Sequence, residues 1–350
     1  MSSAHAVTAS DRRTSVRLAD GREIIYFDDV PGLDRSTPDR RDLPPYAPAA
    51  ELRYDALQGE EVLVAAHRQN RTYQPAPGEC PLCPSRDGHL SEIPAPDYHV
   101  VSFENRFPSL GGPAGGRCEV LCFTSDHDGS FATLPPERLA TVGRAWADRT
   151  TELGERPDVE YVFLFENRGA AIGATLPHPH GQIYAFPYVP PVPRRMLAAA
   201  ERFREEHGRC LMCDVVAREA AGPRVVAETD RFLAYVPEAA RWPYEVYVAP
   251  RFCVPDLPAL GAATRDELMG LYADVLRRFD ALYEHATPYM ACWYQAPARS
   301  SRRLAHLCAR VYTPQRTADK LKFLATAETG GGAYINDVLP ETAAARLREL

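Results

Sequence analysis

The chain has 350 residues, of which 45% are hydrophobic and 25% charged, and its net charge is −7. The length favours two domains or two fused halves, and the composition is that of a globular protein. The acidic balance argues against a dedicated nucleic-acid binder, so we expect no nucleic-acid partner. With no long uncharged apolar run and no signal-peptide pattern at the start, we expect no membrane contact and a cytoplasmic location, where cysteines are thiols or metal ligands.

The predicted elements of the first half are mostly strands. Residues 1–15 are expected to be flexible. A hairpin around Asp20-Gly21 follows, because this dipeptide suits a tight turn between apolar strands. A later strand, at residues 60–68, delivers His67, Arg68 and Arg71 at its end. Further strands are expected at 98–105, 118–126 and 159–169, and a helix with a proline start at 135–153.

The second half repeats this order of elements. Helices are expected at 193–208 and 264–285. The strands are expected at 224–230, 232–238, 244–250, 289–297 and 304–314. The predicted organisation is a flexible N-terminus at 1–15, a catalytic half at 16–200 and a degenerate half at 201–350.

An internal duplication is indicated by three motifs that recur in the same order. In residue number, "CPLC" at 80–83 and "CLMC" at 210–213 are offset by 130, "EVLCFTSDH" and "EVYVAPR" by 126, and "HPH" and "HLC" by 128. On this comparison Arg251 stands where the first copy has His127, and Cys308 stands where it has His180. We therefore expect one half to keep the chemistry and the other to become support.

A zinc site is predicted in the first half. Cys80 and Cys83 have the C-x2-C spacing that lets two thiolates bind one tetrahedral zinc ion. His127 and His178 are candidates for the other two ligands. The alternative is a pair of reduced thiols near unrelated histidines. For Cys210 and Cys213 we favour plain thiols, because the sequence suggests no further ligands.

The stretch "GATLPHPHGQIYAF" at 173–186 is the candidate reactive segment. In an extended chain His178 and His180 point the same way, and if His178 binds metal, His180 is available as a nucleophile toward phosphorus. Gly181 permits close approach, and Gln182 can donate its amide N–H to a phosphoryl oxygen. The alternatives are two metal-ligand histidines or two core histidines.

The string "PHPHGQIY" resembles the active-site signature of the galactose-1-phosphate uridylyltransferases in the histidine-triad superfamily. The segments "CPLC", "FENRFPSL", "CFTSDH", "FENRGAAIGATLPHPHGQ" and "KLKFLATAETGGGAYINDVLPE" are similar to that family in order and spacing. The resemblance implies an α+β fold, with two tandem histidine-triad-like halves forming an antiparallel half-barrel sheet flanked by helices. It also implies a homodimer.

The implied reaction is a ping-pong transfer of UMP between a UDP-sugar and a sugar 1-phosphate. His180 would form a uridylyl-histidine, and Gln182 would steady the phosphoryl oxygens. Zinc would support the loop. The substrate-binding positions implied by the resemblance are Arg68, Arg71, Asn105, Asn167, Gly173 and Thr175, with Lys322, Phe323 and Glu328 reaching the sugar from the partner subunit.

Some positions depart from the family pattern. Tyr294, Cys308, Arg310 and Met196 replace the ligands of a second metal site that some members have, so we predict no metal there. These changes leave open a nucleotidyltransferase or NDP-sugar phosphorylase of the same fold with another sugar or nucleoside. A non-catalytic nucleotide-binding homologue is a further alternative. Gln182, in place of a third histidine, disfavours a hydrolase.

Overall fold

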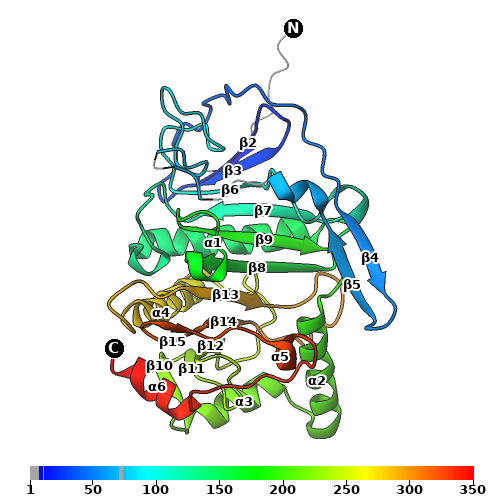
Figure 1. Ribbon diagram of the computed structural model, residues 1–350, viewed down its shortest axis with the longest axis vertical. Helices are drawn as coiled ribbons and strands as arrows, with labels where there is room; N and C mark the ends of the chain where they lie inside the picture. The colour runs from blue at the N-terminus through cyan, green and yellow to red at the C-terminus, as the bar shows by residue number, and fades with distance from the viewer. Residues whose placement is uncertain (1–7, 11, 71–73, 77) are drawn as a thin grey trace. The chain divides into compact units, whose positions relative to one another are not determined.

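The computed structural model describes residues 8–10, 12–70, 74–76 and 78–350. The chain folds into two compact units, and the second includes two short segments from the first half of the sequence. Unit 1 contains residues 1–130, 134–164 and 175–191, and unit 2 contains residues 131–133, 165–174 and 192–350. Both units combine helices with an antiparallel sheet, so the predicted α+β class is confirmed (Figure 1).

Unit 1 is built around an antiparallel sheet in the order β1-β2-β3-β6-β7-β9-β8, with a separate β4-β5 hairpin. Among the described residues, β1 is the edge strand of this sheet. Its elements are β1 (Thr8–Ser10), β2 (Arg13–Arg17), β3 (Glu23–Phe27), β4 (Glu51–Asp55), β5 (Glu60–Val64), β6 (Val100–Glu104), β7 (Arg117–Cys122), β8 (Tyr161–Arg168), which continues into unit 2, and β9 (His180–Phe186), with α1 (Pro136–Gly154) and the short 3-10 turns η1 (Ala66–Asn70) and η2 (Gly112–Ala114).

The predicted hairpin around Asp20-Gly21 is present. Gly21 has a φ of 89°, which suits glycine, and the Leu18 amide donates to the Arg22 carbonyl across the turn (2.8 Å). The strands pair antiparallel, with Val16 opposite Ile24. Residues 13–15 lie in β2 although we expected flexibility as far as residue 15, because the β3 ladder satisfies their backbone groups.

The predicted helix near residue 135 is α1, which starts after Pro135 and lies against β3 and β6. Its inner face carries a fully buried arginine, Arg149, whose Nε is 2.8 Å from a carboxylate oxygen of Glu119 on β7. A charge in this position is tolerated only because it is paired. The pair therefore fixes the position of α1 over the strand that neighbours β9.

Unit 2 contains an antiparallel sheet in the order β13-β14-β12-β11-β10 and a two-stranded β15-β16 ribbon. Its strands are β10 (Val225–Glu228), β11 (Phe232–Tyr235), β12 (Tyr244–Pro250), β13 (Tyr289–Tyr294), β14 (Cys308–Thr313), β15 (Gln315–Thr317) and β16 (Lys320–Leu321). Its helices are α2 (Pro191–His207, whose first residue belongs to unit 1), α3 (Leu211–Ala220), α4 (Ala262–Asp280), α5 (Thr326–Thr329) and α6 (Pro340–Arg348), with the turns η3 (Phe131–Thr133) and η4 (Ala170–Ile172).

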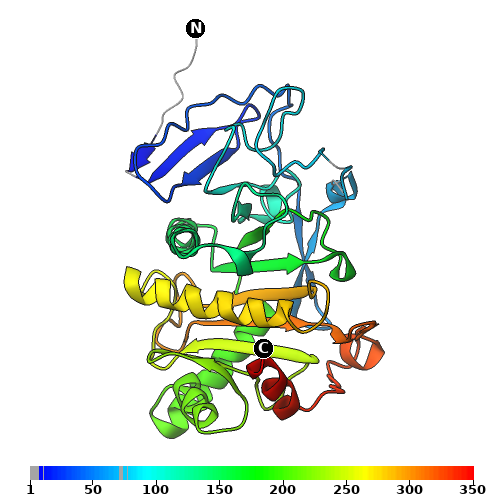
Figure 2. The ribbon, with the colours of Figure 1, turned by 90° about the vertical axis from the view of Figure 1, so that its left-hand side faces the viewer.

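The long helix predicted at 264–285 is α4, which packs its buried face on β10, β11 and β12 (Figure 2). The strand order β10-β11-β12-β14-β13 repeats the order β3-β6-β7-β9-β8 of unit 1, and a long helix follows the third strand of each series. This repetition supports the predicted duplication. Among the described residues, no helix has the length and apolar character needed to cross a membrane.

Candidate active site and metal centre

The two histidines of the candidate reactive segment lie at and just before the start of β9. The strand begins at His180, which lies opposite Cys122 of β7, and the loop just before it holds His178. His180, Gln182 and Tyr184 alternate with the buried residues of β9, so their side chains lie on one face of the sheet.

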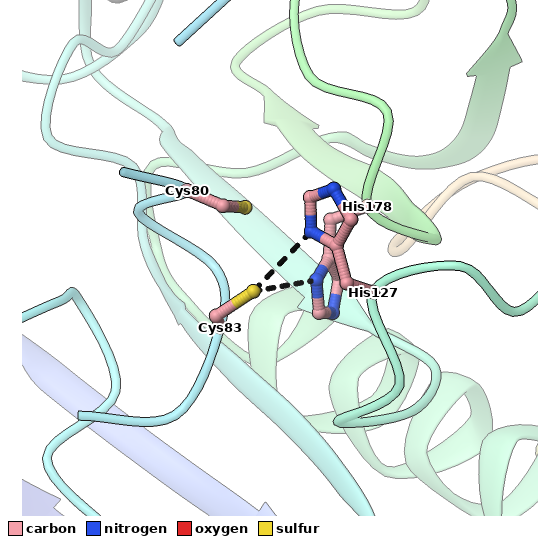
Figure 3. Close-up of side chains that lie close together, drawn as sticks. All are labelled: Cys80, Cys83, His127 and His178. Carbon is pink, nitrogen blue, oxygen red and sulfur yellow. Dashed lines mark hydrogen bonds between the residues drawn. The ribbon is translucent and has the colours of Figure 1, made fainter. Parts of the chain in front are cut away.

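The four predicted zinc ligands come together, as Figure 3 shows. The ligand atoms of Cys80, Cys83, His127 and His178 all lie within 4.8 Å of one another. The Cys83 Sγ atom is 3.3 Å from Nδ1 of His127 and 3.6 Å from Nδ1 of His178. Ligand atoms around a tetrahedral zinc ion are about 3.3–3.8 Å apart. Two thiolates and two imidazole nitrogens at this spacing fit zinc.

The protonation of His178 also fits a metal ligand. Its Nε2 atom lies 2.9 Å from the Thr124 carbonyl and 2.8 Å from the Tyr98 hydroxyl. A proton on Nε2 satisfies the carbonyl and leaves the Nδ1 lone pair directed at Cys83. Burial lowers the pKa of His178 to about 4, so the ring is neutral at pH 7.

The loop that carries the two cysteines is held by the core. Cys80 and Leu82 are buried in the same apolar cluster as Ile24, Tyr26 and Phe103. The pKa of the Cys83 thiol is raised to about 12, mainly by burial and to a lesser extent by the nearby Cys80 thiol. A divalent cation would reverse this effect by stabilising both thiolates.

His180 has a different hydrogen bond from His178. Its Nδ1 atom lies 2.7 Å from the His178 carbonyl oxygen, so Nδ1 carries the proton and donates it to that carbonyl. The Nε2 atom then holds the lone pair. Burial lowers the pKa of His180, and the bond to the carbonyl opposes this shift. The arrangement gives a neutral imidazole with an oriented nucleophilic nitrogen.

Arg68 lies near the same face of β9. It is part of η1, and its guanidinium donates to the Phe107 carbonyl and to the Tyr184 hydroxyl. The Tyr184 hydroxyl is also 3.1 Å from the Ser109 hydroxyl. Ser109 and Tyr184 were not predicted from the sequence. The alternation of β9 places Tyr184 beside Gln182, so the strand period was the signal that could have identified it.

The other predicted substrate-binding residues have the following places. Asn105 accepts the Phe107 amide through its side-chain oxygen (2.8 Å), and the Thr175 carbonyl accepts the Gln74 amide (2.9 Å). Both belong to unit 1, whereas Asn167 and Gly173 belong to unit 2. Arg71 lies outside the described residues.

Lys322, Phe323 and Glu328 also belong to unit 2. Lys322 is buried, with its ammonium near the Arg241 carbonyl (3.1 Å) and the Glu328 carboxylate (3.6 Å). The Ala325 amide donates to Glu328 and lowers the pKa of that carboxyl. Phe323 is 76% exposed. The chain therefore holds Lys322 and Glu328 together and leaves Phe323 at the surface.

Unit 2 has a buried ion pair at positions where some members of the resembled family are expected to have metal ligands. The Nε atom of Arg310 is 2.8 Å from Glu245, and its Nη1 atom is 3.5 Å from the Tyr294 hydroxyl. Cys308, two residues before Arg310, is fully buried. A guanidinium at this position opposes the binding of a cation.

Comparison with known proteins places the chain in a family. The model of the galactose-1-phosphate uridyl transferase N-terminal domain matches residues 111–190, and that of the C-terminal domain matches residues 197–350. A galactose-1-phosphate uridylyltransferase of Streptomyces lividans is 45% identical over 97% of this chain and 98% of its own. One of Thermotoga maritima is 40% identical over 85% of this chain and 98% of its own.

Solved structures with a similar fold include a uridylyltransferase. A structure described as a uridylyltransferase has 30% identity and a TM-score of 0.78, covering 85% of this chain and 98% of its own. An ADP-glucose phosphorylase of Arabidopsis thaliana shares the fold, with 24% identity, a TM-score of 0.69 and coverage of 86% and 99%. The resemblance seen in the motifs is confirmed, and the chain belongs to the galactose-1-phosphate uridylyltransferase family of transferases.

Proposed function

We propose that the chain transfers UMP between a UDP-hexose and a hexose 1-phosphate, with galactose 1-phosphate as an acceptor. Its relatives at 45% and 40% identity are named galactose-1-phosphate uridylyltransferases. The observation that carries the proposal is the bond from His180 Nδ1 to the His178 carbonyl (2.7 Å). This bond fixes the tautomer whose Nε2 atom can attack phosphorus.

The first half-reaction forms a covalent intermediate. The Nε2 lone pair of His180 attacks the α-phosphorus of the UDP-sugar, and the bond from that phosphorus to the bridging oxygen breaks. The electron pair leaves with the sugar 1-phosphate. In the second half-reaction, an oxygen of another sugar 1-phosphate attacks the uridylyl group and His180 leaves. The Gln182 amide N–H stabilises the charge on the phosphoryl oxygens.

Arg68 is proposed to bind the nucleotide phosphates, because a guanidinium matches the geometry of phosphate oxygens. The proposed set also includes Arg71, three residues after Arg68 in the sequence, together with Asn105, Asn167, Gly173 and Thr175. Cys80, Cys83, His127 and His178 would hold zinc, which would fix the loop that positions His180. The carbonyl that orients His180 belongs to His178, so metal binding and orientation of the nucleophile are coupled through one residue.

A homodimer is proposed from the exposed apolar side chains near the C-terminus. Phe323 is 76% and Leu339 is 71% exposed, and Tyr334 and Ile335 between them are also exposed. Exposed apolar residues concentrated in one segment are typical of a protein interface. We infer that this segment, with Lys322 and Glu328, reaches the sugar site of a partner subunit.

A cytoplasmic location is proposed because none of the nine cysteines forms a disulfide. Separately, the net charge of −7 gives no reason to expect a nucleic-acid partner.

The test is intact-mass analysis after incubation with UDP-galactose, UDP-glucose and ADP-glucose in parallel. We expect a UMP adduct on the wild-type chain with the UDP-sugars. His180→Gly is expected to show none, and His207→Gly, at the exposed end of α2, is expected to keep it. An adduct with ADP-glucose alone would favour a phosphorylase or another nucleotidyltransferase of this fold. The absence of any adduct would favour a nucleotide-binding homologue.

A further inference from the structure

A second cluster of potential metal ligands lies in unit 2. The ligand atoms of Cys210, Cys213, Cys253 and His306 all lie within 4.8 Å of one another. We expected plain thiols at Cys210 and Cys213 because no further ligands could be found in the sequence. That reason is wrong: the fold brings Cys253, just after β12, and His306, just before β14, to the two thiols.

The distances fit a tetrahedral ion. Nδ1 of His306 is 3.5 Å from the Cys210 Sγ atom and 3.7 Å from the Cys213 Sγ atom. These values fall within the range of about 3.3–3.8 Å between ligand atoms around zinc. Cys210 precedes the first residue of α3 and Cys213 lies in its first turn, so a regular helix holds the two thiols at this spacing.

The imidazole is oriented for metal binding by a backbone carbonyl. His306 is buried, and its Nε2 atom lies 3.1 Å from the Pro250 carbonyl oxygen. This carbonyl accepts the Nε2 proton, which leaves the Nδ1 lone pair facing the cysteines. In His178, likewise, the Nε2 atom lies 2.9 Å from a backbone carbonyl oxygen, that of Thr124, and Nδ1 faces the cysteines.

The two clusters correspond position by position. The offset in residue number between the two copies is 130 for each cysteine of the C-x2-C pair and 128 for the buried histidine. The offset from Thr124 to Pro250 is 126, and the same offset carries His127 to Cys253. The comparison of repeats that placed Arg251 opposite His127 is therefore corrected: Cys253 stands there. Cysteine in place of histidine preserves a zinc ligand.

From this correspondence and geometry we propose that Cys210, Cys213, Cys253 and His306 form a structural zinc site of the Cys3His type. Four protein ligands leave no open position, so the site binds no substrate. It fastens the start of α3 to the loops beside β12 and β14. The inference does not depend on the proposed function. Cys253 is exposed, which gives the metal a route to the site.

The experiment is zinc analysis of the purified full-length chain by elemental and native mass spectrometry. We expect two zinc ions per chain in the wild type and one each in Cys253→Ser, His306→Ala and Cys80→Ser. Cys292→Ala removes a buried thiol of unit 2 that belongs to neither cluster, and it is the control expected to keep two. One zinc ion in both the wild type and Cys253→Ser would overturn the proposal.

A measurement on the wild-type chain avoids variants that fail to fold. A thiol-alkylating reagent is added before and after a chelator, and the modified cysteines are mapped by peptide mass. We expect Cys210, Cys213 and Cys253 to be protected together and to react together after chelation. Immediate alkylation of the exposed Cys253 in zinc-loaded protein would contradict the site. A disulfide between Cys210 and Cys213 without zinc would overturn it as well.

Discussion

At the residue scale, His178 and His180 differ in the hydrogen bonds that they make. The Nε2 proton of His178 is directed at the Thr124 carbonyl, and the Nδ1 proton of His180 at the His178 carbonyl. Opposite tautomers therefore expose opposite nitrogens in two histidines that are separated by one proline. Identical side chains are thereby suited to different proposed roles, His178 to that of metal ligand and His180 to that of nucleophile.

Gln182 is expected to act on the phosphoryl group and not on the fold. It shares one face of β9 with His180 and is partly exposed. Gln182→Ala should lower kcat by about 10²- to 10³-fold, as the loss of one donor to a developing oxyanion does. Steady-state and single-turnover rates with UDP-galactose measure this. The melting temperature serves as the control, because a large fall in it would assign Gln182 a structural role.

Glu166 has a buried carboxyl group, and we expect its protonation state to change the free energy of unfolding. The Tyr289 hydroxyl donates to its Oε1 atom (2.7 Å), and Oε2 is buried with no hydrogen-bond partner among the described residues. Burial raises its pKa from 4.5 to about 7, against the opposing influence of Tyr289 and Arg168. Between these pH values the folded chain holds a proton that the unfolded chain has lost.

The free energy of unfolding should therefore fall as the pH rises from 4.5 to about 7, by up to about 3 kcal/mol from this group. Denaturant titrations at several pH values measure it in the wild type and in Glu166→Gln. The variant removes the ionisable group, so the difference between the two proteins should grow with pH over this range. A difference independent of pH would show that Glu166 is ionised in the fold.

At the scale of elements, the close approach of two strands sets the position of β9. Gly116, just before β7, has a φ of 72°, and a Cβ atom there would lie 2.2 Å from the Ala185 carbonyl oxygen. Both the backbone conformation and the space therefore require glycine. The contact lies at the opposite end of the β7–β9 ladder from His180, so it bears on the register and not on the chemistry.

We expect Gly116→Ala to destabilise the chain by about 2 kcal/mol or more, since the backbone strain and the clash add. Gly32→Ala is the matched control, with a φ of 79° and no atom within 4 Å of its Cβ position. It carries the strain alone, for which about 1 kcal/mol is expected. Unfolding in urea measures both. Equal losses in the two variants would mean that β7 moves to relieve the clash.

At the scale of the whole molecule, the two units share one strand order but differ in their charged interiors. Glu119 of β7 is paired with Arg149 of α1, whereas Glu245 of β12 is paired with Arg310 of β14. Arg310 corresponds to Gln182 at an offset of 128, the same offset that relates the buried histidines of the two metal clusters. In unit 2 a buried ion pair therefore occupies the position that corresponds to the proposed phosphate-binding amide. For this reason we expect chemistry in unit 1 only.

The proposed shared site can be tested by mixing two inactive variants. His180→Gly removes the nucleophile, and Lys322→Met removes the ammonium of the segment assigned to the partner subunit. After unfolding and refolding together, about half of the dimers are mixed and each has one intact site, so about a quarter of the wild-type activity should return. Each variant refolded alone is the control. No recovery, with dimers confirmed by light scattering, would mean that each site is built within one chain.

The amino-acid sequence was sufficient to identify the family and the first cluster of candidate metal ligands. The spacing of Cys80 and Cys83 and the string around His178 and His180 are local patterns, and they predicted residues that do lie together. Local patterns also predicted other elements. Hydrophobic periodicity predicted the helices α1 and α4, and the Asp20-Gly21 dipeptide predicted the hairpin turn.

The second set of candidate ligands became apparent in the folded structure. Cys253 and His306 carry no local signal, and they become candidate ligands because the loops after β12 and before β14 meet at the start of α3. Likewise the tautomers of His178 and His180 depend on carbonyl groups that the strand register supplies. Local patterns fix which elements form, whereas a ligand set or a proton position is fixed by contacts between segments far apart in the chain.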